Sequence, residues 1–172
     1  MKVLNAVTQE LLKSDARPPW AKKLRHYQWT GANWLHRPPF PMRGRLLNDD
    51  RGFGKTFMGL AAARLRQDRG LSDNKCVLVL APASARFDWR RDAAKLWPEA
   101  KVSIVSEKVV AKRKGESEAS HLARSEPWRE LLRGNDTAVV ACSYSTASME
   151  KLKDFIIAND ILLDTVIPDE AH

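Results

Sequence analysis

The sequence predicts an α/β domain with a mostly parallel sheet and helices on both faces. Short apolar runs typical of strands alternate with longer stretches typical of helices along most of the 172 residues. The runs at 76–81 and 137–142 are continuously apolar, as in strands that are buried on both faces. A glycine-rich loop joins the first apolar run to a helical stretch. These three observations together indicate parallel strands connected by helices.

The expected strands are the apolar runs at residues 45–48, 76–81, 102–106, 137–142 and 161–167. The expected helices lie between them at residues 57–69, 85–96, 128–133 and 147–158. In the first of these helices Met58, Ala61, Ala62 and Leu65 recur at the helical period, and Gly70 follows as a C-cap. The same alternation continues through the other elements, so we expect a single layered domain.

An N-terminal helix is expected before the proline-rich joint at 37–41. Tyr27, Gly31, Trp34 and Leu35 fall on one face of this helix, so the aromatic side chains are expected to pack there. Most of the six tryptophans are expected to belong to the core.

Composition indicates an ordinary globular protein. The apolar fraction is 44% and the charged fraction 29%, and no apolar run approaches the roughly 20 residues of a membrane span. Residues 1–6 lack the apolar centre of a signal peptide, so we expect the protein to stay inside the cell. Cys76 and Cys142 each lie in a strand-like run and are expected to act as small buried apolar residues.

Positive charge is concentrated in the first half of the chain. Residues 1–86 carry 16 Lys and Arg against 6 Asp and Glu, whereas residues 87–172 carry 13 against 15. A basic half suggests a polyanion, either nucleotide phosphates or a nucleic-acid backbone, with a solvated basic surface as the alternative. The segment at 107–126 is expected to be a charged insertion, either a solvated loop or an exposed helix, with a DNA-facing basic loop as the other possibility.

The glycine-rich loop has the composition of a phosphate-binding loop. Its residues are Asp49, Asp50, Arg51, Gly52, Phe53, Gly54, Lys55 and Thr56. Glycines let backbone N–H groups approach phosphates, and the helix N-terminus adds partial positive charge. Lys55 would reach the β- and γ-phosphates and the Thr56 hydroxyl would bind magnesium. Because Asp49 stands where the general pattern has glycine, the alternative is a turn that only caps the helix.

The last apolar run leads into a pair of carboxylates. Asp169 and Glu170, followed by Ala171 and His172, would supply the acidic half of a magnesium-and-water site. Pro168 precedes them and has no N–H for a sheet. Either the strand therefore ends at Ile167, or the acidic turn is displaced.

Five segments, in this order, resemble the motifs of the first motor lobe of superfamily-two helicase-like ATPases, most closely the Snf-type DNA translocases. They are the adenine-recognising motif at 24–28, the nucleotide loop at 49–56, motif Ia at 79–84 with Trp89 following, motif Ib at 141–145 and motif II at 169–172. The resemblance implies a RecA-like P-loop NTPase lobe over residues 24–172, incomplete at its C-terminus, with residues 1–23 as an N-terminal extension. It also implies a second RecA-like lobe, in the same or another chain.

The resemblance implies ATP and magnesium as cofactors. Gln28 would recognise adenine through its amide, which offers both a donor and an acceptor. Lys55 would bind the negatively charged phosphates, Thr56 and Asp169 would hold magnesium, and Glu170 would orient or deprotonate the attacking water.

The resemblance also implies DNA as a partner, bound through its backbone without regard to sequence. Ser84 and Ser143 follow two expected strands and would bind phosphate oxygens. Helix capping by Ser84 is the alternative. His172 would couple the nucleotide site to the DNA side.

Three functions are open at this stage. The first is part of an ATP-dependent DNA translocase or helicase, in which this piece alone would be nearly inactive because loss of an arginine finger costs about a thousandfold or more. The second is a non-catalytic nucleic-acid-binding or regulatory module derived from such a motor, against which Lys55, Asp169 and Glu170 argue. The third is an unrelated P-loop enzyme such as a small-molecule kinase, which would not need the segments at 24–28 and 169–172.

Overall fold

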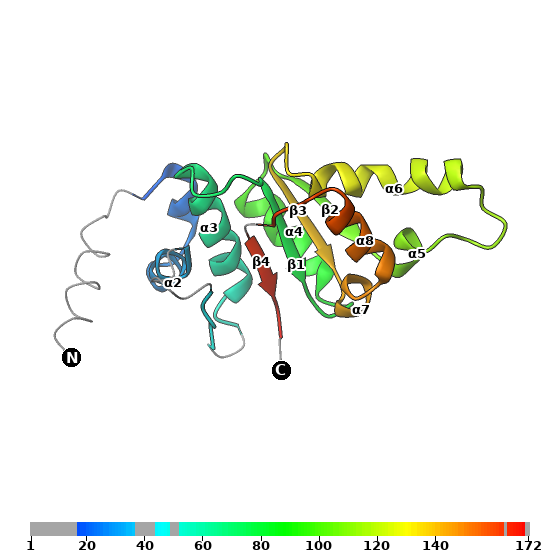
Figure 1. Ribbon diagram of the computed structural model, residues 1–172. Coiled ribbons are helices and arrows are strands. Elements are labelled where there is room, and N and C mark those ends of the chain that lie inside the picture. Colours follow the sequence, from blue (N-terminus) through cyan, green and yellow to red (C-terminus); the bar gives the residue numbers. More distant parts are fainter. Residues whose placement is uncertain (1–16, 37–43, 49–51, 164, 171–172) are drawn as a thin grey trace. The chain divides into compact units, whose positions relative to one another are not determined.

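The computed structural model describes residues 17–36, 44–48, 52–163 and 165–170. The chain divides into two compact units, Met1–Arg69 and Gly70–His172, and each is described by itself (Figure 1). The expected proline-rich joint at 37–41 and most of the expected N-terminal extension lie outside the described residues.

The first unit is built on two packed helices, α2 (His26–His36) and α3 (Lys55–Asp68), after a short 3-10 helix η1 (Pro19–Lys23). The apolar residues that predicted α3 are all buried. A Cβ on Gly31 would come within 2.4 Å of Met58 Sδ, so α2 and α3 approach each other closely at this glycine. The helix expected at 57–69 is therefore confirmed, with a start two residues earlier.

The packing predicted for one face of α2 is only partly correct, because Gly31 of that face meets α3 whereas the two aromatic side chains remain at the surface. Tyr27 and Trp34 are 38% and 40% exposed. The buried residues of α2 are Trp29, Ala32, Asn33 and His36. Both sets have helical spacing and both contain aromatic residues, so periodicity alone did not distinguish them. Trp20 helps to determine which face of α2 is buried, because its ring packs edge-on against Trp29 with centroids 6.3 Å apart.

The segment at 45–48, expected as a strand, has no strand structure. A strand needs a hydrogen-bonded neighbour, and among the described residues this segment has no sheet pairing. Leu46 is 78% exposed, and the Arg45 guanidinium lies 4.3 Å from the centroid of the Trp34 ring.

The second unit contains a parallel sheet of four strands in the order β2-β3-β1-β4 (Figure 1). The strands are β1 (Cys76–Leu80), β2 (Lys101–Val105), β3 (Ala138–Cys142) and β4 (Thr165–Pro168). β3 and β1 are central and almost wholly buried, as their continuous apolar sequences predict. The parallel α/β fold expected from the sequence is confirmed.

The strand expected at 161–167 begins later, at Thr165, because Ile161 takes part in the C-terminal cap of the preceding helix. Asp160 has a left-handed φ of 47°, and the N–H of Ile161 donates to the carbonyl of Ile156 at 3.0 Å. The Asp160 N–H donates to Ile157 at 3.1 Å. This pair of bonds is a Schellman motif, which ends the helix. The strand therefore starts further along the chain.

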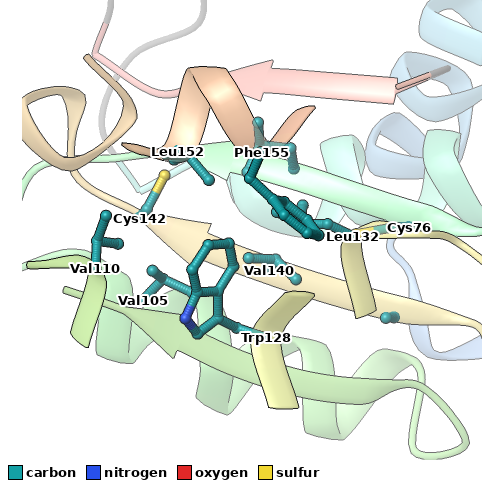
Figure 2. Close-up of a cluster of buried hydrophobic side chains, with 11 residues drawn as sticks. Cys76, Val105, Val110, Trp128, Leu132, Val140, Cys142, Leu152 and Phe155 are labelled. Atoms are coloured by element: carbon teal, nitrogen blue, oxygen red, sulfur yellow. The ribbon is translucent and has the colours of Figure 1, made fainter. Parts of the chain in front are cut away.

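Helices cover both faces of the sheet. They are α4 (Arg86–Leu96), α5 (Glu107–Val110), α6 (Glu118–Leu132), α7 (Tyr144–Ala147) and α8 (Glu150–Ala158). On one face, side chains of α6 and α8 pack on the strands, with the Trp128 and Phe155 rings edge to face at 5.6 Å (Figure 2). Alternate strand residues point to the other face, where α4 buries Trp89, Ala93 and Leu96.

The charged insertion expected at 107–126 is largely helical, since α5 and the first half of α6 lie in it. Ser117 caps α6 by accepting a hydrogen bond from the Ser120 N–H at 3.2 Å. Residues 118–120 are exposed, so the exposed-helix alternative is confirmed for this part. Pro127 is accommodated inside α6.

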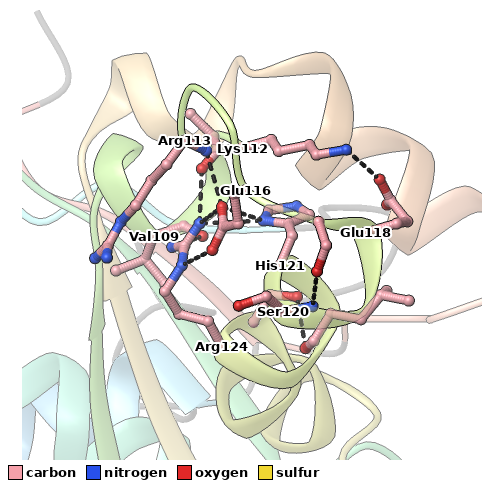
Figure 3. Close-up of polar contacts among 12 residues, drawn as sticks. Val109, Lys112, Arg113, Glu116, Glu118, Ser120, His121 and Arg124 are labelled. Carbon is pink, nitrogen blue, oxygen red and sulfur yellow. Dashed lines mark hydrogen bonds and ion pairs between the residues drawn. The ribbon is translucent and has the colours of Figure 1, made fainter.

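One arginine closes the loop between α5 and α6. Arg124 donates to both carboxylate oxygens of Glu116, at 2.9 and 2.8 Å, and to the carbonyls of Lys108, Val109 and Ala111, each at 2.9 Å (Figure 3). The Arg124 hydrogen bonds are the main cause that lowers the pKa of Glu116 to about 2. The loop is thus held by charge-assisted bonds to its own backbone.

Both cysteines are free thiols buried in the central strands, as predicted. Burial raises the pKa of Cys76 to about 12 and that of Cys142 to about 11, so both stay protonated and unreactive. Four of the six tryptophans are buried, which confirms that most belong to the core. In the part of the chain that the structure describes, no helix combines the length and apolarity needed to cross a bilayer.

Candidate functional site

The glycine loop leads directly into α3. Gly52 and Gly54 have left-handed φ values of 87° and 76°, and Gly54 is the N-cap of the helix. Left-handed residues in a loop can direct successive backbone N–H groups to one side. Such N–H groups bind anions, and a helix N-terminus adds to this binding. No side chain caps α3, and Lys55 is its first residue. Asp49, Asp50 and Arg51 lie outside the described residues.

Gln28 lies against this loop. Its Oε1 accepts a hydrogen bond from the Arg25 N–H at 3.0 Å, and its Nε2 donates to the Phe53 carbonyl at 3.4 Å. The first bond is half of a capping box, in which the third helical residue reaches back to the N-cap. The Tyr27 ring meets the Phe53 ring edge-on at 5.8 Å. The structure therefore brings the predicted adenine-recognising residue to the predicted phosphate loop.

The acidic turn follows β4 immediately. Pro168 is the last residue of that strand, in register with Leu80, and the Asp169 N–H donates to the Leu80 carbonyl at 2.7 Å. Along a strand, successive N–H groups point to opposite edges, so the missing N–H of Pro168 falls on the edge away from β1. The alternative that the strand ends at Ile167 is therefore wrong, because the strand continues through Pro168 and the turn is hydrogen-bonded to β1.

Glu170 has an unusual backbone conformation. Its φ is 54°, in the left-handed region, where a residue with a Cβ is disfavoured by about 1–2 kcal/mol. Strain of this kind persists where surrounding contacts hold it, and it is common at functional sites.

Two aromatic residues hold Asp169. Trp89 Nε1 donates to its Oδ2 at 2.7 Å, and the Tyr144 hydroxyl donates to its backbone carbonyl at 2.9 Å. Burial, followed by the negative charges of Asp169 and Glu170, raises the pKa of Tyr144, so the hydroxyl keeps its proton. The sequence placed Trp89 after motif Ia and Tyr144 within motif Ib, but it did not indicate these contacts, because no spacing rule connects residues 80 and 25 positions apart.

The two serines predicted to meet DNA have different surroundings. Ser143 is 9% exposed and caps α7, accepting from the Thr146 N–H at 3.1 Å. Its hydroxyl also bonds those of Ser145 and Thr146, at 2.9 and 2.8 Å. Ser84 is exposed in the turn before α4, whose N-cap is Ala85, so the capping alternative for Ser84 is wrong. Their DNA roles stay predictions.

The predicted nucleotide-site residues belong to both units. Gln28, Lys55 and Thr56 lie in the first, and Asp169 and Glu170 in the second. His172 lies outside the described residues. The hydroxyl of Thr56 and the carboxylate of Asp169 are hard oxygen donors, which suit magnesium. The described residues include no group of three His, Cys, Asp or Glu able to hold a metal, but magnesium uses one or two carboxylates with phosphate and water oxygens.

Comparison with known proteins shows the family. The model of the SNF2-related domain matches residues 27–172, so the chain belongs to this family of helicase-like ATPases, and the resemblance seen in the sequence is confirmed.

Three relatives illustrate the extent of the similarity. The ATP-dependent helicase fft3 of Schizosaccharomyces pombe is 29% identical over 152 residues, which cover 87% of this chain and 15% of the relative. A Drosophila melanogaster homologue of a SWI/SNF-related, matrix-associated, actin-dependent regulator of chromatin (subfamily A, containing DEAD/H box 1) is 27% identical over 150 residues, 87% of this chain and 16% of the relative. The DNA excision repair protein CSB of Oryza sativa subsp. japonica is 24% identical over 133 residues, 77% of this chain and 11% of the relative. The chain thus spans less than a fifth of each relative.

Proposed function

We propose that this chain is the nucleotide-binding lobe of an ATP-dependent DNA translocase or helicase. The loop at 49–56 would be its Walker A motif and residues 169–172 its DEAH box. The observation that carries the proposal is the Gln28 amide lying against a glycine loop at the start of α3, because that arrangement can meet a base and its phosphates together. Family membership supports the same function.

In the first unit, Lys55 would neutralise the β- and γ-phosphates while backbone N–H groups of the loop bind their oxygens. Thr56 would contribute its hydroxyl to magnesium. Gln28 would select adenine, since its amide can both donate to and accept from the base edge. For this, Gln28 would exchange its long bond to Phe53, at 3.4 Å, for a bond to the base.

In the second unit, Asp169 would hold magnesium and Glu170 would orient or deprotonate the water that attacks the γ-phosphorus. Magnesium, when bound, supplies positive charge to the phosphate oxygens. The carboxyl ends of parallel strands are where ligands bind in open α/β sheets, and the turn follows β4 directly. Most of the catalysis would then come from positioning and charge.

DNA is the proposed partner, bound through its backbone. Ser84 and Ser143 follow β1 and β3, which are neighbours in the sheet, so both would face one stretch of phosphates. His172 would couple this side to the nucleotide, and a second RecA-like lobe would complete the motor. A protein with these partners would act inside the cell, where DNA and ATP are present.

Calorimetry with ATP and magnesium tests this function. Lys55→Ala is expected to abolish the binding that the wild-type chain shows, because the positive charge of the lysine neutralises the phosphates. Lys22→Ala removes an exposed lysine of η1 from the same unit and is the matched control, expected to bind as wild type does. Equal and measurable affinities of wild type and Lys55→Ala would contradict the proposal.

A further inference from the structure

The acidic turn carries two contacts that neither the motifs nor the proposed function explain. We infer that Trp89 and Tyr144 are positioning residues: Trp89 orients the carboxylate of Asp169, and Tyr144 orients the peptide bond that leads into Glu170. The inference rests on the proposed function, because it assigns these residues to the metal and water sites of that function. One aromatic donor thus holds the Asp169 carboxylate and the other holds the backbone carbonyl that precedes Glu170.

Trp89 can hold the Asp169 carboxylate firmly. Its ring is 2% exposed within α4, so the position of Nε1 is set by core packing. Its bond to Oδ2, at 2.7 Å, is a short, charge-assisted hydrogen bond. When one carboxylate oxygen is held and the backbone N–H is paired to Leu80, the other oxygen has a defined direction. Carboxylates that bind metals are commonly oriented in this way by an outer hydrogen bond.

Tyr144 acts on the backbone instead. Its hydroxyl donates to the Asp169 carbonyl at 2.9 Å, and that carbonyl belongs to the planar peptide unit preceding Glu170. Holding the plane of this peptide restrains the φ angle of Glu170, which is 54°. Without the bond, the strained conformation loses one of the contacts that sustain it. By restraining this φ angle, Tyr144 therefore helps to set the direction of the Cα–Cβ bond of Glu170.

The two donors come from helices that follow different strands of the sheet. Trp89 lies on the helix after β1, Tyr144 begins the helix after β3, and Asp169 follows β4. These three strands are adjacent, and their carboxyl ends meet at one edge. The turn is thus held from two separate helices, which is the arrangement that precise placement of catalytic groups requires.

Conservative variants separate positioning from folding. Trp89→Phe keeps an aromatic ring but removes the N–H donor, and Tyr144→Phe removes only the hydroxyl. Trp128→Phe is the matched control: Trp128 is also buried in the second unit, at 3% exposure, and its Nε1 has no hydrogen-bond partner among the described residues. All three variants are expected to fold.

The first measurement tests the contact itself. In ¹⁵N-labelled protein, the indole N–H resonance of Trp89 is expected to lie downfield and to move upfield in Asp169→Asn, because the charged acceptor is lost. It should not move comparably in Glu170→Gln. If the chemical shift of the Trp89 indole N–H did not change in Asp169→Asn, the inference would be overturned independently of any nucleotide binding.

The second measurement tests the role, using the full-length protein. Trp89→Phe is expected to weaken magnesium-dependent ATP binding about tenfold, the low end of the effect of outer hydrogen bonds on metal sites, and to leave magnesium-free binding unchanged. Tyr144→Phe is expected to keep KM near the wild-type value and to lower kcat severalfold, because Glu170 acts on the water. Trp128→Phe is expected to change neither quantity.

The outcomes distinguish this inference from the proposed function. If Asp169→Asn and Glu170→Gln impair wild-type activity while Trp89→Phe and Tyr144→Phe match wild type, the inference is overturned and the function stands. If Trp128→Phe is impaired as much as Trp89→Phe, packing is the cause and the inference is again overturned. If the wild-type protein binds no magnesium nucleotide, the proposed function fails and the inference fails with it.

Discussion

The amide of Gln28 lies so close to Gly54 that a Cβ on this glycine would come within 2.2 Å of Gln28 Nε2. Gly54 also has a φ of 76°, which L side chains rarely adopt. Glycine is therefore required there for two separate reasons, one local and one tertiary. The contact ties the predicted base-recognising residue to the predicted phosphate loop.

Gly54→Ala should consequently displace Gln28. We expect a loss of about 1–2 kcal/mol in the free energy of unfolding from the left-handed backbone, together with weaker discrimination between ATP and GTP. Gly52→Ala is the control, since Gly52 has a φ of 87° but a Cβ there meets nothing within 4 Å. Urea unfolding and nucleotide titration should show similar stabilities but different base selectivity. Equal selectivity of the two variants would refute the contact's role.

The close approach of α2 to α3 predicts an energetic coupling between Gly31 and Met58. Gly31→Ala places a Cβ 2.4 Å from Met58 Sδ, so the methionine must change rotamer or the helices must separate. We expect a loss of about 1–3 kcal/mol in the wild-type background. The loss should be smaller in the Met58→Ala background, and a double-mutant cycle measures the difference. Additive effects would show that the helices do not meet at this pair.

The Glu116–Arg124 pair predicts a loss of stability in acid. The folded-state pKa of Glu116, about 2, lies below its ordinary value of 4.5, so its stabilisation is fully present above pH 4.5 and is lost as the pH falls towards 2. Glu116→Gln should flatten the dependence of unfolding free energy on pH in this interval. Glu118→Gln, which removes an exposed partner of Lys112, is the control and should leave the dependence near that of wild type.

The left-handed conformation of Glu170 predicts that activity opposes stability at this residue. Glu170→Gly should raise the free energy of unfolding by up to about 1 kcal/mol and remove ATP hydrolysis in the full-length protein. Asp160→Gly is the matched control, because Asp160 has a φ of 47° at the end of α8. It should raise stability similarly and leave hydrolysis intact. Thermal unfolding and phosphate release measure the two effects; a destabilised Glu170→Gly protein would argue against backbone strain.

The proposed DNA contacts predict binding that depends on salt rather than sequence. Affinity for duplex DNA should fall steeply between about 50 and 200 mM salt, because phosphate contacts release counterions. Ser84→Ala should weaken binding equally for unrelated DNA sequences. Fluorescence anisotropy measures both effects, and an affinity that is flat across this salt range would contradict backbone recognition.

Much of the fold could be predicted because its signals are local. The spacing of apolar residues in α3 and the continuous apolar sequences of β1 and β3 reflect burial that each segment requires by itself. The errors arose where a segment had two acceptable outcomes. The run at 45–48 could be a strand only with a partner, and α2 had two faces of similar character.

By itself the sequence determined the parallel α/β class, because the spacing of apolar residues along the chain is sufficient for this. The resemblance of its motifs determined the family, and the residues that would carry nucleotide chemistry stay predictions. Only the tertiary structure decided that Trp89 and Tyr144 hold Asp169, that Gln28 lies against Gly54, and that Pro168 fits within β4. The contacts of Asp169 and the fit of Pro168 depend on which strands are neighbours and on which edge or face a group lies, and the Gln28 contact depends on the packing of α2 on α3. Hydrogen bonds join atoms that are close in space, and their partners here are separated by up to 80 positions in the chain.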